Sequence, residues 1–290
     1  MCKKNVINVE EISRTEIINI LAKRIQMGKI SVEEQATVGQ YYSLQAPRKI
    51  YRYRPGNSKD MEALMRNEIW FSSISCLNDP FEFNIKVDPE RFVASDKDMK
   101  NKMNTMPPLQ QQAIYKKMRE AVDYEVYYRD VLPNYTIACF SERNDSLLMW
   151  GHYSDGHKGI CLEYDTLNSD YLNKRVVIPV NYTDEPPALT GKDQTTFYRL
   201  LLEMMSTKSR DWEYEREWRC IQDKGACGDK WTSKGAQLDF SVPTAIYVGC
   251  KAENTLVKSL IYTCKEVLGI PLYKMVKSNI KYKLLPEQII

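Results

Sequence analysis

The sequence predicts an α+β fold, with a mixed, largely antiparallel sheet core, N-terminal helices and an inserted helical segment. Three observations lead to this prediction. Strand-like segments recur along the 290 residues without the regular alternation of strand and helix that builds a doubly wound parallel sheet. Neither G-x-G-x-x-G nor G-x-x-x-x-G-K-S/T occurs, which disfavours the common nucleotide-binding folds. A stretch at about residues 89–131 is rich in Met, Lys, Gln and Tyr and has little strand character.

The N-terminal part is expected to be helical. Apolar residues between positions 8 and 26 lie near a helical stripe that ends at Gly28, and a second, polar helix runs to about residue 45. Pro47 then precedes the first expected strand. We therefore expect a helical extension at residues 1–46 and a single α+β domain at 47–290, with the helical insertion inside it.

The other expected elements follow from β-branched and aromatic runs, helical periodicity and capping residues. Asn57 or Ser58 can cap a short helix, and Asp145 or Ser146 can cap another. The expected strands are residues 49–54, 69–72, 135–140, 158–164, 176–182, 217–221 and 245–248. The remaining expected helices are residues 197–205 and 256–267.

Charge and hydropathy argue against a nucleic-acid-coating protein and against a membrane protein. With 41 basic and 38 acidic residues the formal charge is only +3, so nucleic acid is possible as a partner but not favoured. No apolar run approaches the roughly 18 residues that span a bilayer, and the polar N-terminus lacks the apolar core of a signal peptide. We expect a cytoplasmic protein that does not bind membranes.

The eight cysteines never form a C-x-x-C pair, which argues against a structural zinc site. Those among strand-like residues are expected to be reduced core residues, namely Cys139, Cys161, Cys220 and Cys250.

A turn sequence, Asn78-Asp79-Pro80-Phe81-Glu82, follows the second expected strand. An Asx-Pro turn would fix the backbone and present Asn78, Asp79 and Glu82 at a strand edge, where polar side chains often bind ligands. The same residues equally suit a plain turn.

Both histidines of the chain lie near the expected helix that ends at Tyr153. His152 can contact a ligand or transfer a proton, together with Trp150 and Tyr153. Metal binding is not favoured, because a turn separates His152 from His157 and no further ligands are evident.

The acidic run at residues 211–219 alternates with period two and is expected to be a strand. Glu213, Glu215 and Glu217 would then share one face, where crowding raises the pKa of at least one of them. Alternatively, this is a solvated face whose arginines form ion pairs. We expect Glu217 to be the essential carboxylate, because it lies nearest the buried end of the strand.

Seven short motifs together resemble the bacterial domain-of-unknown-function 2971 family, over about residues 49–221. They are Tyr51-Arg52-Tyr53-Arg54, Trp70-Phe71-Ser72, Asn78-Asp79-Pro80-Phe81-Glu82, Cys139-Phe140-Ser141-Glu142, Met149-Trp150-Gly151-His152-Tyr153, His157-Lys158-Gly159-Ile160-Cys161 and Glu215-Arg216-Glu217-Trp218-Arg219. The resemblance implies no activity.

A second resemblance is to ADP-ribosyltransferases of the arginine–serine–glutamate type, on Arg52 or Arg54, then Ser72-Ser73, then Glu215-x-Glu217. It implies NAD as the cofactor, with an arginine on its phosphates and Ser72 supporting the site. By the same resemblance, Glu217 would bind the nicotinamide ribose and stabilise an oxocarbenium-like transition state. Ser72-Ser73 departs from the serine–threonine–serine run of that family.

Two functions remain as alternatives. One is an NAD-consuming ADP-ribosyltransferase-like or glycohydrolase effector, for instance a toxin or a phage-defence protein. The other is a non-catalytic module that senses a nucleotide or a protein partner through aromatic and polar side chains. A third possibility is a metal-independent nuclease that uses His152 and Glu217, but no characteristic residue spacing in the sequence supports it.

The expected site is one cleft that binds a nucleotide and holds no metal. Its catalytic residues would be Glu217, Glu215 and His152. Its cofactor-binding residues would be Arg52, Tyr51, Ser72, Asn78, Asp79, Glu82, Trp150 and Tyr153. The sequence identifies neither an acceptor nor a protein partner.

Overall fold

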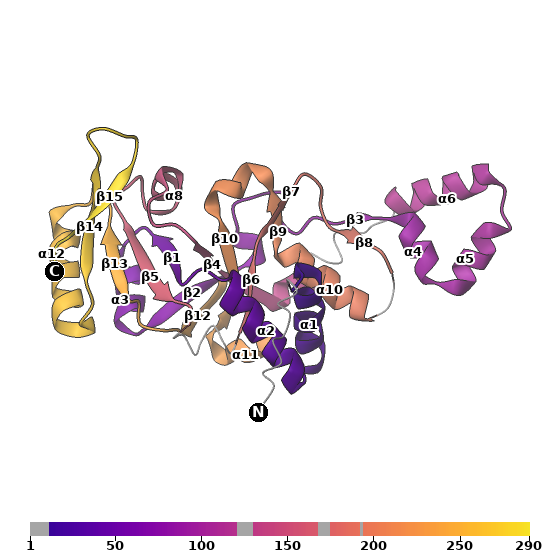
Figure 1. The fold of residues 1–290 in the computed structure, drawn as a ribbon, viewed down its shortest axis with the longest axis horizontal. Coiled ribbons are helices and arrows are strands. Elements are labelled where there is room, and N and C mark those ends of the chain that lie inside the picture. Colours follow the sequence, from indigo (N-terminus) through magenta and orange to yellow (C-terminus); the bar gives the residue numbers. More distant parts are fainter. Residues whose placement is uncertain (1–11, 121–129, 168–174, 192–193) are drawn as a thin grey trace, which may run out of the picture. The chain divides into compact units, whose positions relative to one another are not determined.

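The computed structural model describes residues 12–120, 130–167, 175–191 and 194–290. It confirms the predicted fold class, because helices precede a large, mostly antiparallel sheet (Figure 1). Contacts between Cα atoms divide the chain into two compact units. The first comprises Met1–Ala46, Asn84–Val122 and Pro186–Met205, and the second comprises Pro47–Phe83, Asp123–Glu185 and Ser206–Ile290.

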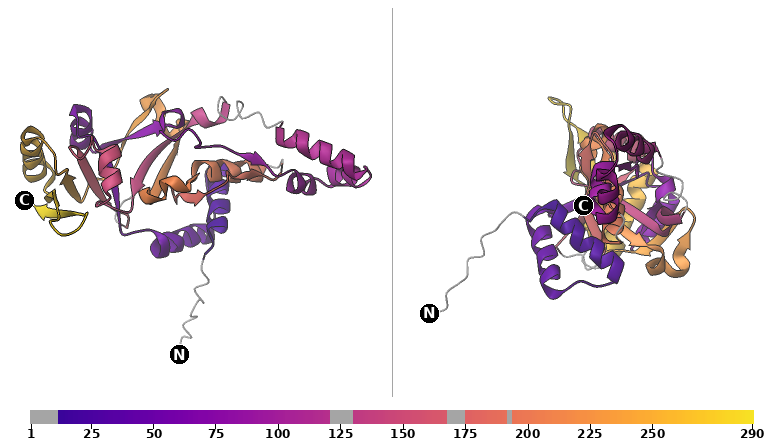
Figure 2. Two further views of the ribbon diagram at one scale, coloured as in Figure 1. Left: turned by 90° about the horizontal axis from the view of Figure 1, so that it is seen from above. Right: turned by 90° about the vertical axis from the view of Figure 1, so that its right-hand side faces the viewer.

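The first unit is mainly helical. Ser13 caps α1 by accepting a hydrogen bond from the backbone N–H of Glu16, and Gly28 ends that helix with a φ of 70°. Helices α1 and α2 lie side by side (Figures 1 and 2). The elements are α1 (Arg14–Met27), α2 (Val32–Gln45), β3 (Lys86–Val87), α4 (Pro89–Ser95), α5 (Lys97–Asn104), α6 (Pro108–Glu120), β8 (Ala188–Leu189) and α10 (Gln194–Met205).

Three of these helices, α4 to α6, occupy most of the stretch predicted to be a helical insertion. Asp88 caps α4 and Asp96 caps α5, so local capping explains where both helices begin. Residues 121–129 of the predicted insertion lie outside the described residues.

The second unit contains the large sheet. Its strands are β1 (Lys49–Arg54), β2 (Glu68–Ser73), β4 (Tyr135–Ser141), β5 (Ile160–Asp165), β6 (Val176–Pro179), β10 (Glu217–Asp223), β11 (Trp231–Thr232), β12 (Gly235–Asp239), β13 (Ala245–Val248), β14 (Leu272–Lys277) and β15 (Leu284–Gln288). Every described pair of neighbours in this sheet is antiparallel except β13 and β14.

Short helices and a second small sheet complete this unit. The helices are α3 (Ser58–Met65), α8 (Leu147–Tyr153), α11 (Lys224–Cys227) and α12 (Asn254–Tyr262), which continues as a π-helix over Thr263–Leu268. The small sheet pairs β7 (Asn181–Thr183) with β9 (Thr207–Ser209) in parallel. Asn57 caps α3 and Ser146 caps α8, in agreement with the sequence.

The large sheet branches at β4, and this branch creates the candidate site. Strand β10 pairs along the whole of β4, so β1 and β2 must share the opposite edge of β4. Strand β1 pairs with β4 only at Tyr51 and Ser141, whereas β2 pairs with β4 near Ile137. The guanidinium of Arg52 bridges the resulting gap, donating to the carbonyl oxygens of Cys139 on β4 and Trp70 on β2.

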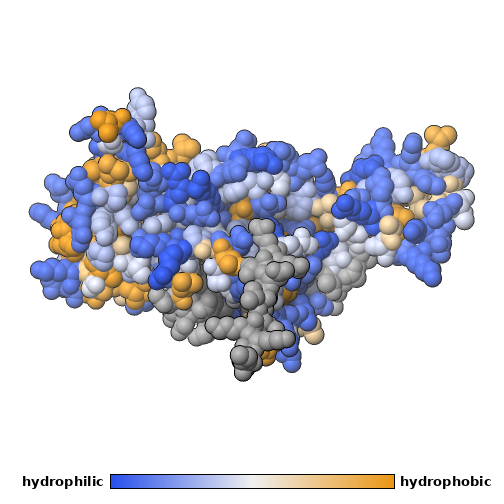
Figure 3. All heavy atoms as spheres, in the orientation of Figure 1, coloured by the Kyte–Doolittle hydropathy of each residue, from blue (hydrophilic) through white to orange (hydrophobic). Residues whose placement is uncertain are grey.

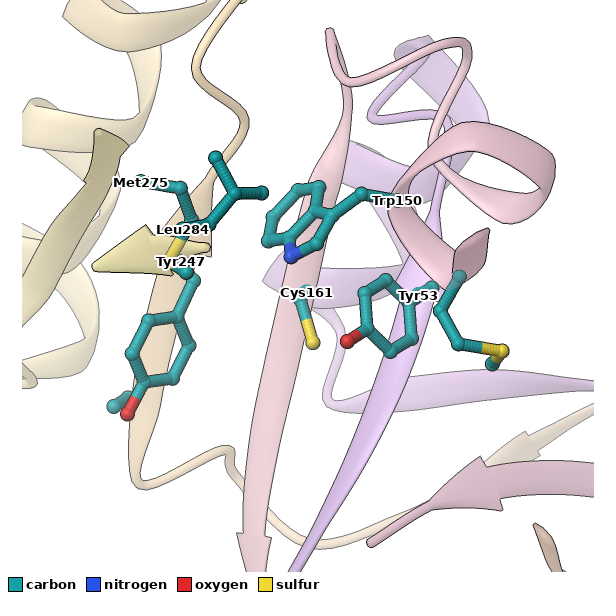
Figure 4. Packing of buried hydrophobic residues seen from close by; sticks show 8 residues of the cluster. Tyr53, Trp150, Cys161, Tyr247, Met275 and Leu284 are labelled. Carbon is teal, nitrogen blue, oxygen red and sulfur yellow. The ribbon is translucent and has the colours of Figure 1, made fainter. Parts of the chain in front are cut away.

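An aromatic core lies beside α8 and strands β1, β5 and β13. Figure 4 shows the indole of Trp150 pointing from α8 toward Tyr53 and Cys161. The rings of Trp150 and Tyr53 meet edge to face with their centroids 5.3 Å apart. Trp150 is completely buried here, and its Nε1 donates to the carbonyl oxygen of Asn144 at 2.7 Å.

The end of this sheet carries an apolar surface. Hydrophobic residues gather where α12 and the β14–β15 hairpin lie in Figure 3. The exposed apolar residues of this region are Tyr262, Val267, Ile280, Tyr282 and Leu285. In the part of the chain that the structure describes, no helix has both the length and the hydropathy to cross a membrane.

Candidate functional site

A cavity of about 210 Å³ opens beside the gap between β1, β2 and β4, entirely within the second unit. Strands β1 and β4, helix α8, the segment after β2 and the residues around β9 and β10 form its walls. The predicted site residues that line it are Tyr51, Arg52, Ser72, Asn78, Glu82, Tyr153, Glu215 and Glu217. The fold thus brings together polar side chains from distant parts of the sequence.

Strand register explains why several of these side chains share one face of the sheet. Glu217 of β10 lies opposite Ser141 of β4, and Arg219 lies opposite Cys139. Tyr51 of β1 also pairs with Ser141. Because paired residues project to the same side of a sheet, all five side chains lie on the cavity face.

Five buried charged residues form the centre of the site, and we call them the Lys208 cluster. They are Glu82, Lys208, Glu215, Glu217 and Arg219. The ammonium of Lys208 lies 2.7 Å from Glu215 Oε2, 3.1 Å from Glu82 Oε1 and 3.5 Å from Glu217 Oε2.

Arg219 completes the cluster. Its guanidinium donates two hydrogen bonds to the Glu217 carboxylate, one from Nε at 2.9 Å and one from a terminal nitrogen at 3.1 Å. It also forms an ion pair with Glu82 at 3.0 Å. The cluster therefore holds three carboxylates and two cations. When all five groups are charged, one negative charge is in excess.

The pKa values of Glu217, the first residue of β10, and of Glu215, two residues before it, are shifted in opposite directions. Burial by itself would raise the pKa of Glu217, but the charges of Arg219 and Lys208 outweigh burial and lower that pKa to about 2. Burial and the neighbouring charge of Glu217 raise the pKa of Glu215, and the contact with Lys208 only partly offsets them. Of these two carboxylates, Glu215 is therefore the one that takes up a proton more readily.

The segment before β10 is not the predicted strand, so the prediction that Glu213, Glu215 and Glu217 share a strand face is wrong. Residues Arg210–Glu215 form a 3₁₀-helix that begins where the Ser209 side chain accepts from the N–H of Asp211. Arg216 then takes a left-handed φ of 43°, and β10 begins only at Glu217. This turn leaves Glu213 exposed and buries Glu215.

Helix α8 places Tyr153 over Glu215. The Tyr153 hydroxyl donates to Glu215 Oε1 at 2.5 Å and accepts from the Asn78 amide at 2.9 Å. On the other side, the Ser141 hydroxyl donates to the main-chain oxygen of Glu215 at 2.6 Å. Glu215 is thus fixed from both sides at the wall of the cavity.

Three predicted site residues lie outside the cavity lining. His152 is exposed, with its ring centroid 6.3 Å from the rings of both Tyr153 and Tyr214. Trp150 belongs to the aromatic core, because its position on α8 faces the sheet interior. Asp79 is buried in its own turn, where Oδ1 accepts from the N–H of Phe81 at 2.9 Å.

Sequence reasoning missed Lys208. It lies on the three-residue strand β9, which carries no catalytic motif. The only available signal was the excess of carboxylates in the acidic run, which must recruit a cation when it is buried. Among the described residues, no group of three or more His, Cys, Asp or Glu side chains is arranged to hold a metal ion.

Comparison with known proteins gives one match. Residues 149–220 match a family model described as "Protein of unknown function (DUF2971)". No curated protein and no solved structure matches the chain. The resemblance to ADP-ribosyltransferases is supported by none of these comparisons.

The matched residues run from α8 to β10 and include six that line the cavity or belong to the Lys208 cluster: Met149, Tyr153, Lys208, Glu215, Glu217 and Arg219. The motifs before residue 149 lie outside the match. Over residues 149–220, the chain is therefore similar to the family of unknown function DUF2971.

Proposed function

We propose that the cavity binds NAD⁺ and that the protein breaks the bond between its nicotinamide and ribose, as an ADP-ribosyltransferase-like or NAD-glycohydrolase effector. One observation carries this proposal: the Lys208 cluster has one more carboxylate than it has cations, and it lies at the wall of a cavity. A buried excess of negative charge favours a ligand that brings a positive charge. The pyridinium ring of NAD⁺ is such a group.

The same charge would assist the reaction. When the C1′–N bond breaks, its electron pair leaves with nicotinamide, which becomes neutral, and positive charge develops on the ribose. A fixed carboxylate beside that charge stabilises the transition state. Water or an acceptor then attacks C1′ and loses its proton, and a carboxylate with a raised pKa can accept it.

We assign this role to Glu215 rather than Glu217. The bidentate contact with Arg219 already neutralises Glu217. Among the residues that the structure describes, the only cation bonded to Glu215 is Lys208, which it shares with two other carboxylates. Tyr153 orients Glu215 through its hydroxyl.

The lining of the cavity also includes a cation, Arg52. Burial lowers the pKa of Arg52 to about 10, with the charge of Arg54 contributing, so Arg52 stays protonated at neutral pH. Arg52 donates hydrogen bonds to main-chain carbonyls, and no carboxylate of the described residues forms an ion pair with it. A cavity lined by both a cation and an anionic cluster suits a ligand that combines a pyridinium with a diphosphate.

Incubating the purified chain with NAD⁺ tests this proposal directly. We expect free nicotinamide to accumulate, measured by chromatography, in the presence of water alone or of a cell extract that supplies acceptors. Absence of nicotinamide under both conditions, together with absence of NAD⁺ binding, would refute the proposal.

A non-catalytic sensing module is the second candidate, and the hydrogen bonding of Glu215 favours it. Both carboxylate oxygens of Glu215 already have a donor, one from Tyr153 and one from Lys208. A fully satisfied network of this kind rigidifies a site, as binding without chemistry requires. Saturable NAD⁺ binding without nicotinamide release would identify the protein as a sensor.

A further inference from the structure

A second cavity, of about 290 Å³, lies on α3, β2, β12 and the far side of Arg52. Arg52 and Arg54 line both cavities, because they extend from β1 beside the gap at the branch of the sheet. The other basic residues of the second cavity are Lys59 and Lys234, at its exposed rim.

The acidic residues of this cavity are already neutralised. Asp60 pairs with Arg54 at 2.7 Å. Glu68 pairs with two cations that do not line the cavity, Arg66 at 3.0 Å and Lys230 at 3.2 Å. The cavity therefore keeps the positive charges of Arg52, Lys59 and Lys234.

Hydrogen-bond donors without acceptors accompany these charges. Neither Lys59 nor Lys234 has an ion-pair partner among the residues that the structure describes. The buried Nε2 of Gln237, within the same cavity, has no hydrogen-bond acceptor in the described chain. A buried amide N–H without an acceptor is costly, so a ligand oxygen at this position would be favourable.

We propose that this second cavity binds a small phosphate-bearing anion. A phosphate group offers several acceptor oxygens and about two negative charges, which match the lysines at the rim and the Gln237 amide. This site shares Arg52 and Arg54 with the NAD⁺ cavity, but its lysines and Gln237 belong to the second cavity, and it does not depend on the proposed reaction. It would act as a binding site for a phosphorylated metabolite or effector.

Titration calorimetry with inorganic pyrophosphate tests the site in the full chain. We expect saturable binding of one pyrophosphate per chain, weakened by added salt. The double variant Lys59→Gln/Lys234→Gln should bind at least about tenfold more weakly, because two charge-assisted contacts are lost. Gln237→Glu, which is nearly isosteric and places a negative charge at the same position, should abolish binding.

Two further variants make the result specific. Lys258→Gln removes an exposed lysine of α12 that lines neither cavity, and it should bind pyrophosphate within about twofold of the wild type. Glu215→Gln, in the first cavity, should also leave this affinity within about twofold, whatever it does to NAD⁺. Circular dichroism would establish that each variant is folded.

Absence of pyrophosphate binding by the wild type would overturn the inference. So would unchanged binding by folded Gln237→Glu and by the double lysine variant, since the anion would then bind elsewhere. Failure of the NAD⁺ proposal alone would leave pyrophosphate binding intact, so the two proposals fail independently.

Discussion

Replacing Arg219 by methionine is expected to lower the free energy of unfolding by about 3–5 kcal/mol, the usual cost of removing one partner from a buried ion pair. Arg219 is completely buried, and it neutralises Glu217 and Glu82 directly. Its loss leaves three buried carboxylates with Lys208 as their only partner inside the cluster. Urea unfolding followed by circular dichroism measures the change.

Arg210 provides the matched control in the same unit. Its ion pair with Asp184 has a similar length, 3.0 Å, but the two side chains are 57% and 76% exposed. Arg210→Met should therefore cost no more than about 1 kcal/mol. Equal losses in the two variants would show that the Lys208 cluster does not depend on buried charge pairing.

Replacing Glu215 by glutamine is expected to reduce NAD⁺ turnover at least about a hundredfold, the order usually lost when a group that stabilises transition-state charge is removed. Glutamine keeps the shape of the side chain and can still hydrogen-bond to Tyr153. The fold should therefore persist, as judged by circular dichroism. Initial rates of nicotinamide release measure the effect.

Glutamine variants of the neighbouring glutamates distinguish a catalytic role of Glu215 from a general effect of removing negative charge. Glu213 lies two residues away on the same 3₁₀-helix but is exposed, so Glu213→Gln should retain nearly full activity. Glu217→Gln should mainly reduce stability, because Arg219 loses its bidentate partner. If Glu215→Gln kept full activity while a folded Glu217→Gln lost it, the catalytic carboxylate would be Glu217.

The pH dependence gives a further check on Glu215. Because its pKa is raised above the ordinary 4.5, the ionised form that the reaction needs appears only at higher pH. The wild-type rate should therefore rise with pH along an acid limb centred above 4.5. A limb centred below 4.5 would instead fit a carboxylate with a lowered pKa, such as Glu217.

The sequence predicted the elements that depend on local signals. Strand β1 begins and ends where its alternating pattern does, and the caps of α3 and α8 lie at predicted residues, because capping and alternation act over a few positions. The predicted strands at β2, β4, β5, β10 and β13 are also confirmed, within the usual variation at their ends.

Features that depend on tertiary contacts escaped prediction. Strands β12, β14 and β15 were not predicted, since their segments become strands by pairing with other parts of the chain: β12 pairs with β2, and β14 pairs with β13 and β15. The acidic run had the period of a strand, but the Ser209 cap and the left-handed Arg216 give it a 3₁₀-helix. Trp150 was predicted to contact a ligand but is a core residue, because the sequence does not reveal which face of a seven-residue helix is buried.

Most residues of the candidate site could be predicted from the sequence, because they are polar residues at the ends of strands. The balance of charge within the site could not be predicted. Arg52, Ser72, Tyr153 and Glu217 line one cavity as expected, and His152 lies outside it because α8 turns that side chain to the solvent. Lys208, which bonds to three carboxylates, comes from a strand too short to carry a pattern. The excess negative charge, on which the proposed function rests, is visible only in three dimensions.

The most direct test of that charge compares two ligands that differ in one positive charge. The two ligands are the oxidised and reduced forms of carba-NAD, in which a methylene replaces the oxygen of the nicotinamide ribose ring, so that neither form is cleaved. The oxidised form has a positively charged pyridinium ring, and the reduced form has a neutral ring. We predict that the wild type binds the oxidised form at least about tenfold more tightly, since a buried charge pair readily contributes about 1.4 kcal/mol. In Glu215→Gln the two affinities should become nearly equal. Equal affinities in the wild type, or an undiminished preference in Glu215→Gln, would contradict the account.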